Sequence, residues 1–210
     1  MTETERAIVV SGEATVRRAP DLAVVSLAVT VRDRDVEPAR QQANERASAI
    51  LARLRELGIP ETDVTAPSLT VQPTYDYRRG AKLTGYEASR PITIRVRDLA
   101  ALGPLLDGLV DDGATQVHGT SMELAQPDAA AREALGAAFV AARGRAEALA
   151  AASGLTLGEP LRIEEEGSGF APMPHMMAMA KGAADESVAT EIAAGEVEIS
   201  VRVRAWFALG

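Results

Sequence analysis

The side chains best suited to chemistry in this chain lie in one stretch near its C-terminus, residues 167–194, which we call the methionine segment. Its candidate side chains are Phe170, Met173, His175, Met176, Met177 and Met179. Thioethers beside an imidazole are ligands that Cu(I) accepts. Closely spaced methionines also form an adaptable apolar surface for another subunit or a peptide, and a loop of this length is often disordered. Because no second histidine and no cysteine stands nearby, we expect a subunit contact or a loop without fixed structure, and no tight copper site.

The rest of the sequence contains no recognisable catalytic set. It has no cysteine, which removes disulfides, thiolate nucleophiles and cysteine-ligated metals. No glycine-rich turn leads from a predicted strand into a helix, so no dinucleotide or phosphate site is indicated. His118 stands alone in a predicted strand and is typical of a structural histidine, while a pair of carboxylates drawn from distant segments stays open. We therefore predict a non-enzymatic protein with no catalytic residues, no metal and no cofactor.

All the tyrosines lie in a second short stretch, which we call the tyrosine segment (residues 73–90). They are Tyr75, Tyr77 and Tyr86. Tyrosines close together on a hairpin often form a contact surface, because each has a large apolar body and a polar tip. They also pack across a hairpin or cover the end of a sheet. The sequence leaves both alternatives open: an interface or ligand patch, and ordinary local packing.

Composition and charge narrow the classes of partner. The net charge is −8, whereas binding of nucleic-acid phosphates needs clustered cations, so we expect no nucleic-acid partner. No run of apolar residues is long enough to span a bilayer, and the polar, acidic residues 1–6 are unlike a signal peptide. As the chain stands, these features predict a cytoplasmic protein, and a periplasmic or exported one if a leader was removed.

Hydrophobic spacing predicts the elements that would position these segments. Apolar alternation predicts strands, and spacings of three and four predict helices. The expected strands are residues 7–16, 22–32, 64–72, 91–97, 115–125, 155–166 and 196–208, and the expected helices are residues 35–57, 98–110 and 127–153. The turn at Pro20 and Asp21 predicts that the first two strands pair as an antiparallel hairpin. Residues 11–13 (Ser-Gly-Glu) are expected to form a turn or flexible element.

Each long helix has a predicted buried side that contains alanine. The first has an apolar stripe formed by Ala39, Ala43, Ala47, Ile50, Leu54 and Leu57. The last carries thirteen alanines between positions 129 and 152, and its expected core-facing residues are Leu135, Phe139, Ala142, Ala146, Leu149 and Ser153. Alanine on this scale favours the helix, and it lets the helix backbone lie close to a sheet.

The order of these elements predicts an α+β fold, a mainly antiparallel sheet packed by amphipathic helices. A weak internal duplication is also indicated, because a helix, a glycine, a strand, one of the two segments, a second glycine and an alternating strand occur twice. Gly58 and Gly85 mark the first copy, and Gly154 and Gly195 mark the second. We expect a single domain over residues 1–210, from which the tyrosine and methionine segments project.

Several stretches, taken in order, resemble the SIMPL-domain family, which includes bacterial oxidative-stress-defence and periplasmic immunogenic proteins. They are residues 10–14 (VSGEA), 19–23 (APDLA), 57–59 (LGI), 72–77 (QPTYDY), 85–89 (GYEAS), 95–99 (RVRDL), 153–155 (SGL) and 195–199 (GEVEI), together with the alanine-rich helix and the methionine segment. The resemblance covers nearly the whole chain. It implies an α+β fold, no established catalytic residues and, for some members, assembly into large ring-like or hollow homo-oligomers. Members are associated with protection against oxidative stress and with the cell envelope.

These observations predict a self-assembling, non-enzymatic protein of the SIMPL type with a stress-protective or scaffolding role. Only 3% of the residues are aromatic, and two segments carry apolar side chains that a lone subunit has little reason to keep, so the expected partner is the chain itself. The alternative from another class is a small-molecule or Cu(I)-binding protein that uses the methionine segment.

Overall fold

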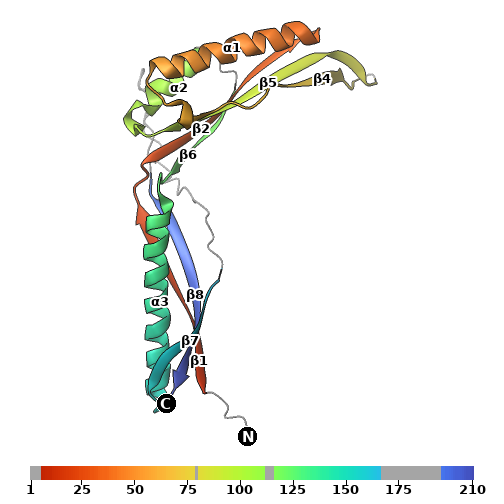
Figure 1. Ribbon diagram of the computed structural model, residues 1–210. Coiled ribbons are helices and arrows are strands. Elements are labelled where there is room, and N and C mark those ends of the chain that lie inside the picture. The colour runs from red at the N-terminus through yellow and green to blue at the C-terminus, as the bar shows by residue number, and fades with distance from the viewer. Residues whose placement is uncertain (1–5, 79, 112–115, 167–194) are drawn as a thin grey trace, which may run out of the picture. The chain divides into compact units, whose positions relative to one another are not determined.

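The computed structural model describes residues 6–78, 80–111, 116–166 and 195–210 (Figure 1). Contacts divide them into two compact units. The terminal unit consists of residues 6–20, 124–166 and 195–210, and the central unit consists of residues 21–78, 80–111 and 116–123. Each unit contains an antiparallel sheet with helix packed on it, which confirms the predicted α+β class.

The described elements follow the predicted order closely. In the terminal unit they are β1 (Ala7–Arg18), α3 (Pro127–Ala152), β7 (Leu157–Glu165) and β8 (Val197–Leu209). In the central unit they are β2 (Leu22–Asp33), α1 (Val36–Glu56), the 3-10 turn η1 (Glu61–Asp63), β3 (Val64–Thr65), β4 (Thr70–Asp76), β5 (Lys82–Val96), the 3-10 turn η2 (Leu99–Ala101), α2 (Leu102–Asp111) and β6 (Gln116–Glu123).

The terminal unit is a sheet of order β1-β8-β7 with α3 on one face (Figure 1). The strict alternation of β8 places Val201, Val203, Ala205 and Phe207 against the helix. The helix contributes one row of buried alanines spaced by four, Ala130, Ala134, Ala138, Ala142, Ala146 and Ala150. Although α3 has 26 residues, no helix in the described part of the chain is both long and apolar enough to cross a membrane.

The backbone of α3 lies almost directly on β1, and Gly12 makes this approach possible. A Cβ atom on Gly12 would stand 2.1 Å from the carbonyl oxygen of Ala138 and 2.3 Å from the backbone nitrogen of Ala142. These are main-chain atoms of a continuous helix, so they cannot turn aside as a side chain would. Arg145 on the same helix donates a hydrogen bond of 2.6 Å to the carbonyl of Ser11, which ties α3 to this edge strand.

The central unit has a sheet of order β3-β5-β2-β6, with β4 also paired to β5 (Figure 1). Helix α1 covers one face with the predicted stripe, and Ala39, Ala43, Ala47, Ile50 and Leu54 are all buried. They pack against alternating aliphatic side chains of the two central strands, Val25, Leu27, Val29, Ile92 and Ile94. Helix α2 adds Leu102, Leu105 and Leu109 to the same core.

Pairing of the first two strands as a hairpin was a wrong prediction. Strand β1 pairs with β8 over its whole length, while β2 pairs with β5 and β6. The short turn at Pro20 carries the chain from one unit into the other, so neighbours in sequence belong to different sheets. Residues 11–13 are also not a turn, because they lie within β1.

The predicted buried side of α3 was correct only in part. Ala142 and Ala146 are fully buried, whereas Leu135 and Leu149 are 36% and 50% exposed. Long side chains at the contact would hold the helix away from β1 and β8, so the alanine row packs inward and the leucines lie outside. The predicted strand over residues 64–72 is likewise two short strands, β3 and β4, separated around Pro67.

Both units share an arrangement in which a helix is followed by two antiparallel strands. In the central unit α1 precedes β4 and β5, and in the terminal unit α3 precedes β7 and β8. In each case the second of the two strands also pairs with another strand of its sheet, β2 or β1. The internal duplication and the single domain over residues 1–210 stay predictions.

The contact between Gly12 and α3 gives a test of this packing. We expect Gly12→Ala to lower the free energy of unfolding by about 1–3 kcal/mol or more, because the added methyl group overlaps helix backbone. The matched control is Gly136→Ala on α3, where a Cβ meets nothing within 4 Å. That change should stabilise the protein by about 0.5–1 kcal/mol through helix propensity. Urea denaturation measures both, and equal stability of the two variants would contradict the packing described.

Candidate functional site

The tyrosine segment forms a β-ribbon that extends past the end of β2 within the central unit. Strand β2 ends at Asp33, opposite Tyr86 of β5. Residues Lys82–Gly85 therefore pair with β4 alone. The hydroxyl groups of Thr74 and Thr84 lie 3.1 Å apart and brace the two strands. An isolated two-stranded ribbon is only marginally stable in water, so this end of the hairpin gains from any surface that covers it.

Gly85 stands where the ribbon leaves the sheet. Its φ is +156°, and a Cβ atom there would lie 2.4 Å from the carbonyl oxygen of Asp33. A residue with a side chain would push the end of β2 away from β5. The glycine thus lets three strands meet at the base of the ribbon, which fixes the position of the tyrosines beyond it.

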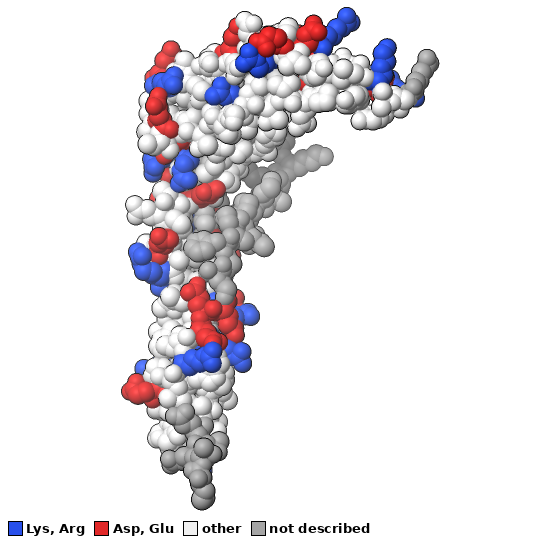
Figure 2. Space-filling view, turned by 45° about the vertical axis from the view of Figure 1, so that its right-hand side comes forward, with Lys and Arg blue, Asp and Glu red and all other residues white. Residues whose placement is uncertain are grey.

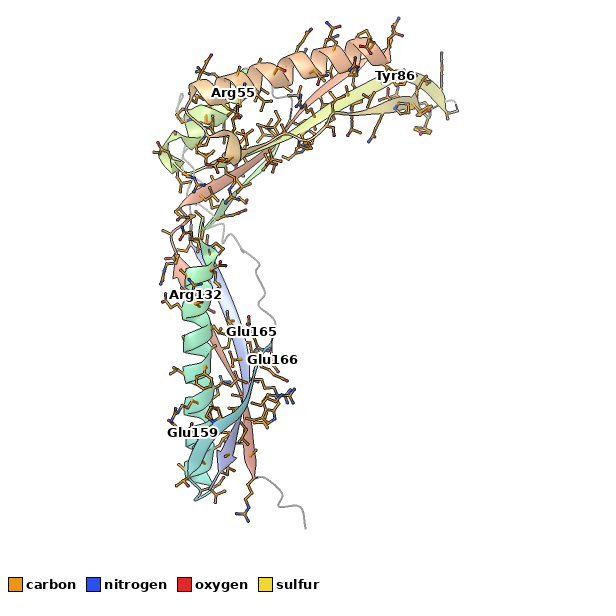
Figure 3. All side chains as sticks on the ribbon, viewed as in Figure 1. Arg55, Tyr86, Arg132, Glu159, Glu165 and Glu166 are labelled. Carbon is orange, nitrogen blue, oxygen red and sulfur yellow. The ribbon has the colours of Figure 1, made fainter. Side chains whose placement is uncertain are left out.

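The ribbon presents three exposed apolar side chains, Tyr75, Tyr77 and Leu83, which we call the hairpin patch. Their exposed fractions are 44%, 74% and 46%. Tyr75 is paired in register with Leu83, and its ring centroid is 6.2 Å from that of Tyr77. Tyr86 is half-buried and lies apart, opposite Pro73 of β4 and Asp33 of β2 (Figure 3). Leu83 was missed from the sequence, since only the register across the turn places it beside Tyr75.

The other sequence candidates do not add to this patch. Phe170, Met173, His175, Met176, Met177 and Met179 lie outside the described residues, so their roles stay predictions. His118 is exposed in β6, which is not the setting of a buried structural histidine. Within the described ranges, no three histidine, aspartate or glutamate side chains are close enough together to hold a metal ion.

Many charged side chains on the surface of the described chain are paired with charges of opposite sign. Figure 2 shows basic and acidic side chains interspersed over α1, where Arg40 pairs with Glu37. On the outer face of the terminal sheet Arg202 donates to Glu13 at 2.8 Å. That hydrogen bond and then the charge of Arg202 lower the pKa of Glu13, and the same hydrogen bond and the charge of Glu13 raise the pKa of Arg202. Paired arginines of this kind are poorly suited to binding phosphates.

The central unit also contains a cavity of about 480 Å³, bounded by the end of α1, η1, the end of β5 and α2. No pattern in the sequence indicated this cavity. Its apolar walls are Leu57, Ile59, Val96, Pro104, Leu105 and Leu109. The cavity forms where α1 ends: Gly58 adopts a φ of +76°, and the chain leaves the helix for η1 and for β3, which pairs with β5. Its size is within the range of small-molecule pockets.

The wall of this cavity holds an ion pair between the buried Asp63 and Arg97, whose side chain is 60% exposed. Asp63 is 6% exposed and is the one charged residue classed as buried in the described part of the chain. Nε and Nη2 of Arg97 donate to its two carboxylate oxygens, each at 3.1 Å. These hydrogen bonds, and then the charge of Asp63, raise the pKa of Arg97. A carboxylate held by such a fork is a structural anchor for η1.

Comparison with known proteins gives a consistent family match. The model of the SIMPL family, described as a protein of unknown function (DUF541), matches residues 8–207. The uncharacterized protein YggE of Escherichia coli K12 is 34% identical over 181 residues, covering 86% of this chain and 74% of that protein. The 26 kDa periplasmic immunogenic protein of Brucella melitensis is 32% identical over 217 residues, covering 99% of this chain and 86% of that protein.

The Asp63–Arg97 pair provides a stability test. Arg97→Met leaves the buried carboxylate without its two donors, so we expect the midpoint of thermal unfolding to fall by about 3–6 °C. Arg55→Met is the control, because its partner Glu61 has a side chain that is 78% exposed, and it should change little. Adding Asp63→Asn to the Arg97 variant should recover part of the loss. Equal midpoints for the Arg97 and Arg55 variants would show that Asp63 does not depend on Arg97.

Proposed function

Because the chain belongs to the SIMPL family, we propose that it works as a self-assembling, non-enzymatic protein with a stress-protective or scaffolding role, and that the hairpin patch is part of its subunit contact. The exposure of the patch is the observation that carries this proposal. Tyr77 is 74% exposed on a ribbon that no third strand and no helix of the described chain covers. Clustered aromatic side chains of this kind are the anchors that dominate protein interfaces.

The chemistry of the patch fits a contact between subunits. Tyr75, Tyr77 and Leu83 combine apolar area with two phenolic hydroxyl groups, a mixture typical of interface centres. The side chains come from two strands braced by the pair Thr74 and Thr84, so little conformational entropy remains to be lost on binding. If the assembly is a closed ring, the contact joins two different surfaces of neighbouring subunits.

The stress-protective role and the location rest on relatives. The resemblance to oxidative-stress-defence proteins supports the first, and the word periplasmic in the name of the Brucella relative supports a place in the cell envelope. Cells that lack the gene should survive peroxide less well than cells that carry it. Fractionation of cells that express the natural gene tests whether the product is in the envelope.

Replacing the hairpin patch tests assembly directly. We expect the combined change Tyr75→Ser, Tyr77→Ser and Leu83→Ser to raise the concentration at which the oligomer dissociates by about tenfold or more, because it removes the aromatic anchors. Light scattering coupled to size-exclusion chromatography measures the mass, and circular dichroism checks the fold. Val140→Ser is the control, since Val140 is 69% exposed on α3, in the other unit, and it should leave the mass unchanged.

Two results would count against the proposal. A wild-type chain that stays monomeric at micromolar concentration and physiological salt would remove self-assembly altogether. An oligomer that is unchanged by the triple substitution, with the fold intact, would leave the hairpin patch as ordinary local packing.

A further inference from the structure

The uncharged walls of the cavity in the central unit are of a single chemical kind. Leu57, Ile59, Pro104, Leu105 and Leu109 make them aliphatic, and none of the lining residues that the structure describes is aromatic. Within the same described set none is serine, threonine, asparagine or glutamine, so none of these neutral side chains can bind the hydroxyl groups of a sugar or the edge of a base. A bound molecule would therefore be held by aliphatic contact, and its body should be a flexible hydrocarbon.

The charged residues of the cavity favour an anion. Among the lining residues that the structure describes, Arg53, Arg95 and Arg97 stand with two acids, Asp63 and Asp98. Both acids have partners inside the protein: Asp63 accepts from Arg97, and Asp98 accepts from the backbone N–H of Ala100 at 3.1 Å. Arg97 is neutralised by Asp63 and Arg53 pairs with Glu56, so Arg95 is the lining arginine that no carboxylate of the described chain pairs with.

Two of these arginines have donors to offer. Arg95 is half-buried and makes no hydrogen bond or ion pair with any residue of the described chain. Arg97 uses Nε and Nη2 for Asp63, which leaves Nη1 without a hydrogen bond among the described residues, while the charge of Asp21 also acts on this arginine. A guanidinium matches the geometry of a carboxylate better than an ammonium group does, so the charged end of the ligand should be a carboxylate.

We propose that this cavity binds a medium-chain aliphatic carboxylate, with its hydrocarbon chain against Leu105 and Leu109 and its carboxylate beside Arg95 and Arg97. The site lies within the central unit and is built from α1, β5 and α2. It does not depend on the hairpin patch or on assembly. The volume of about 480 Å³ accommodates an alkyl chain of this kind.

Gly108 on α2 offers a way to close the cavity without disturbing the fold. It lines the cavity, and a Cβ atom built on it meets nothing within 4 Å. Leucine is also a better helix former than glycine. Gly108→Leu should therefore fold normally and place its side chain in the space that the alkyl chain would occupy. Gly136→Leu on α3 makes the same change at an exposed site with equal room.

The experiment is a titration of the full chain with decanoate below its micelle concentration, followed by calorimetry and by amide chemical shifts. We expect saturable binding of one equivalent, with shifts that cluster in α2 and at the end of β5. Gly108→Leu should weaken binding by about tenfold or more, whereas Gly136→Leu should not change it. Arg95→Gln should weaken decanoate and leave 1-decanol unaffected. The hairpin-patch variant should bind decanoate as the wild type does.

Three outcomes would overturn the proposal. The first is no saturable binding of decanoate, and the second is binding that survives Gly108→Leu, which would place the ligand elsewhere. The third is equal affinity for decanoate, 1-decanol and decyltrimethylammonium, which would show that the arginines do not select the ligand. Because the hairpin-patch variant is measured in the same series, failure of this site and failure of assembly give different results.

Discussion

The close approach of each helix to its sheet is the constraint on which the rest of this structure depends. Alanines at every fourth position of α3 lie on β1 and β8, and the helix backbone at Ala138 and Ala142 stands directly over Gly12. Ala39, Ala43 and Ala47 give α1 the same short distance to β2 and β5. Since an alanine contact buries little side-chain area, the core stays thin, and larger side chains such as Val140 and Leu149 lie outside.

When one helix covers one face of a sheet, the part of that face beyond the end of the helix has no helix over it. Beyond Asp33 the ribbon of β4 and β5 has neither a third strand nor a helix over it, and this is where the hairpin patch is found. At the other end, α1 stops at Glu56, and the space over Val96 is bounded by α2 and η1 instead of by a continuous helix. The two candidate surfaces of the central unit are thus consequences of helix length.

The two surfaces differ in their chemistry. The hairpin patch consists of apolar area with phenolic tips, which suits a protein contact. In the cavity, Asp63 is held by two donors of Arg97 and serves to anchor the turn after α1. The family model, described as a protein of unknown function, spans residues of both units.

The sequence by itself determined the α+β class, the family and nearly every helix and strand, because spacing within one element depends on neighbours along the chain. It identified Tyr75 and Tyr77 but not Leu83, which reaches them only through the register across the turn. Tertiary structure alone decided that β1 pairs with β8, that the alanines and not Leu135 or Leu149 face the sheet, and that a cavity opens beside Arg97. Each of these depends on contacts between residues far apart in sequence. Such contacts are selected by how closely helix and sheet backbones can approach, which the local pattern of the sequence does not contain.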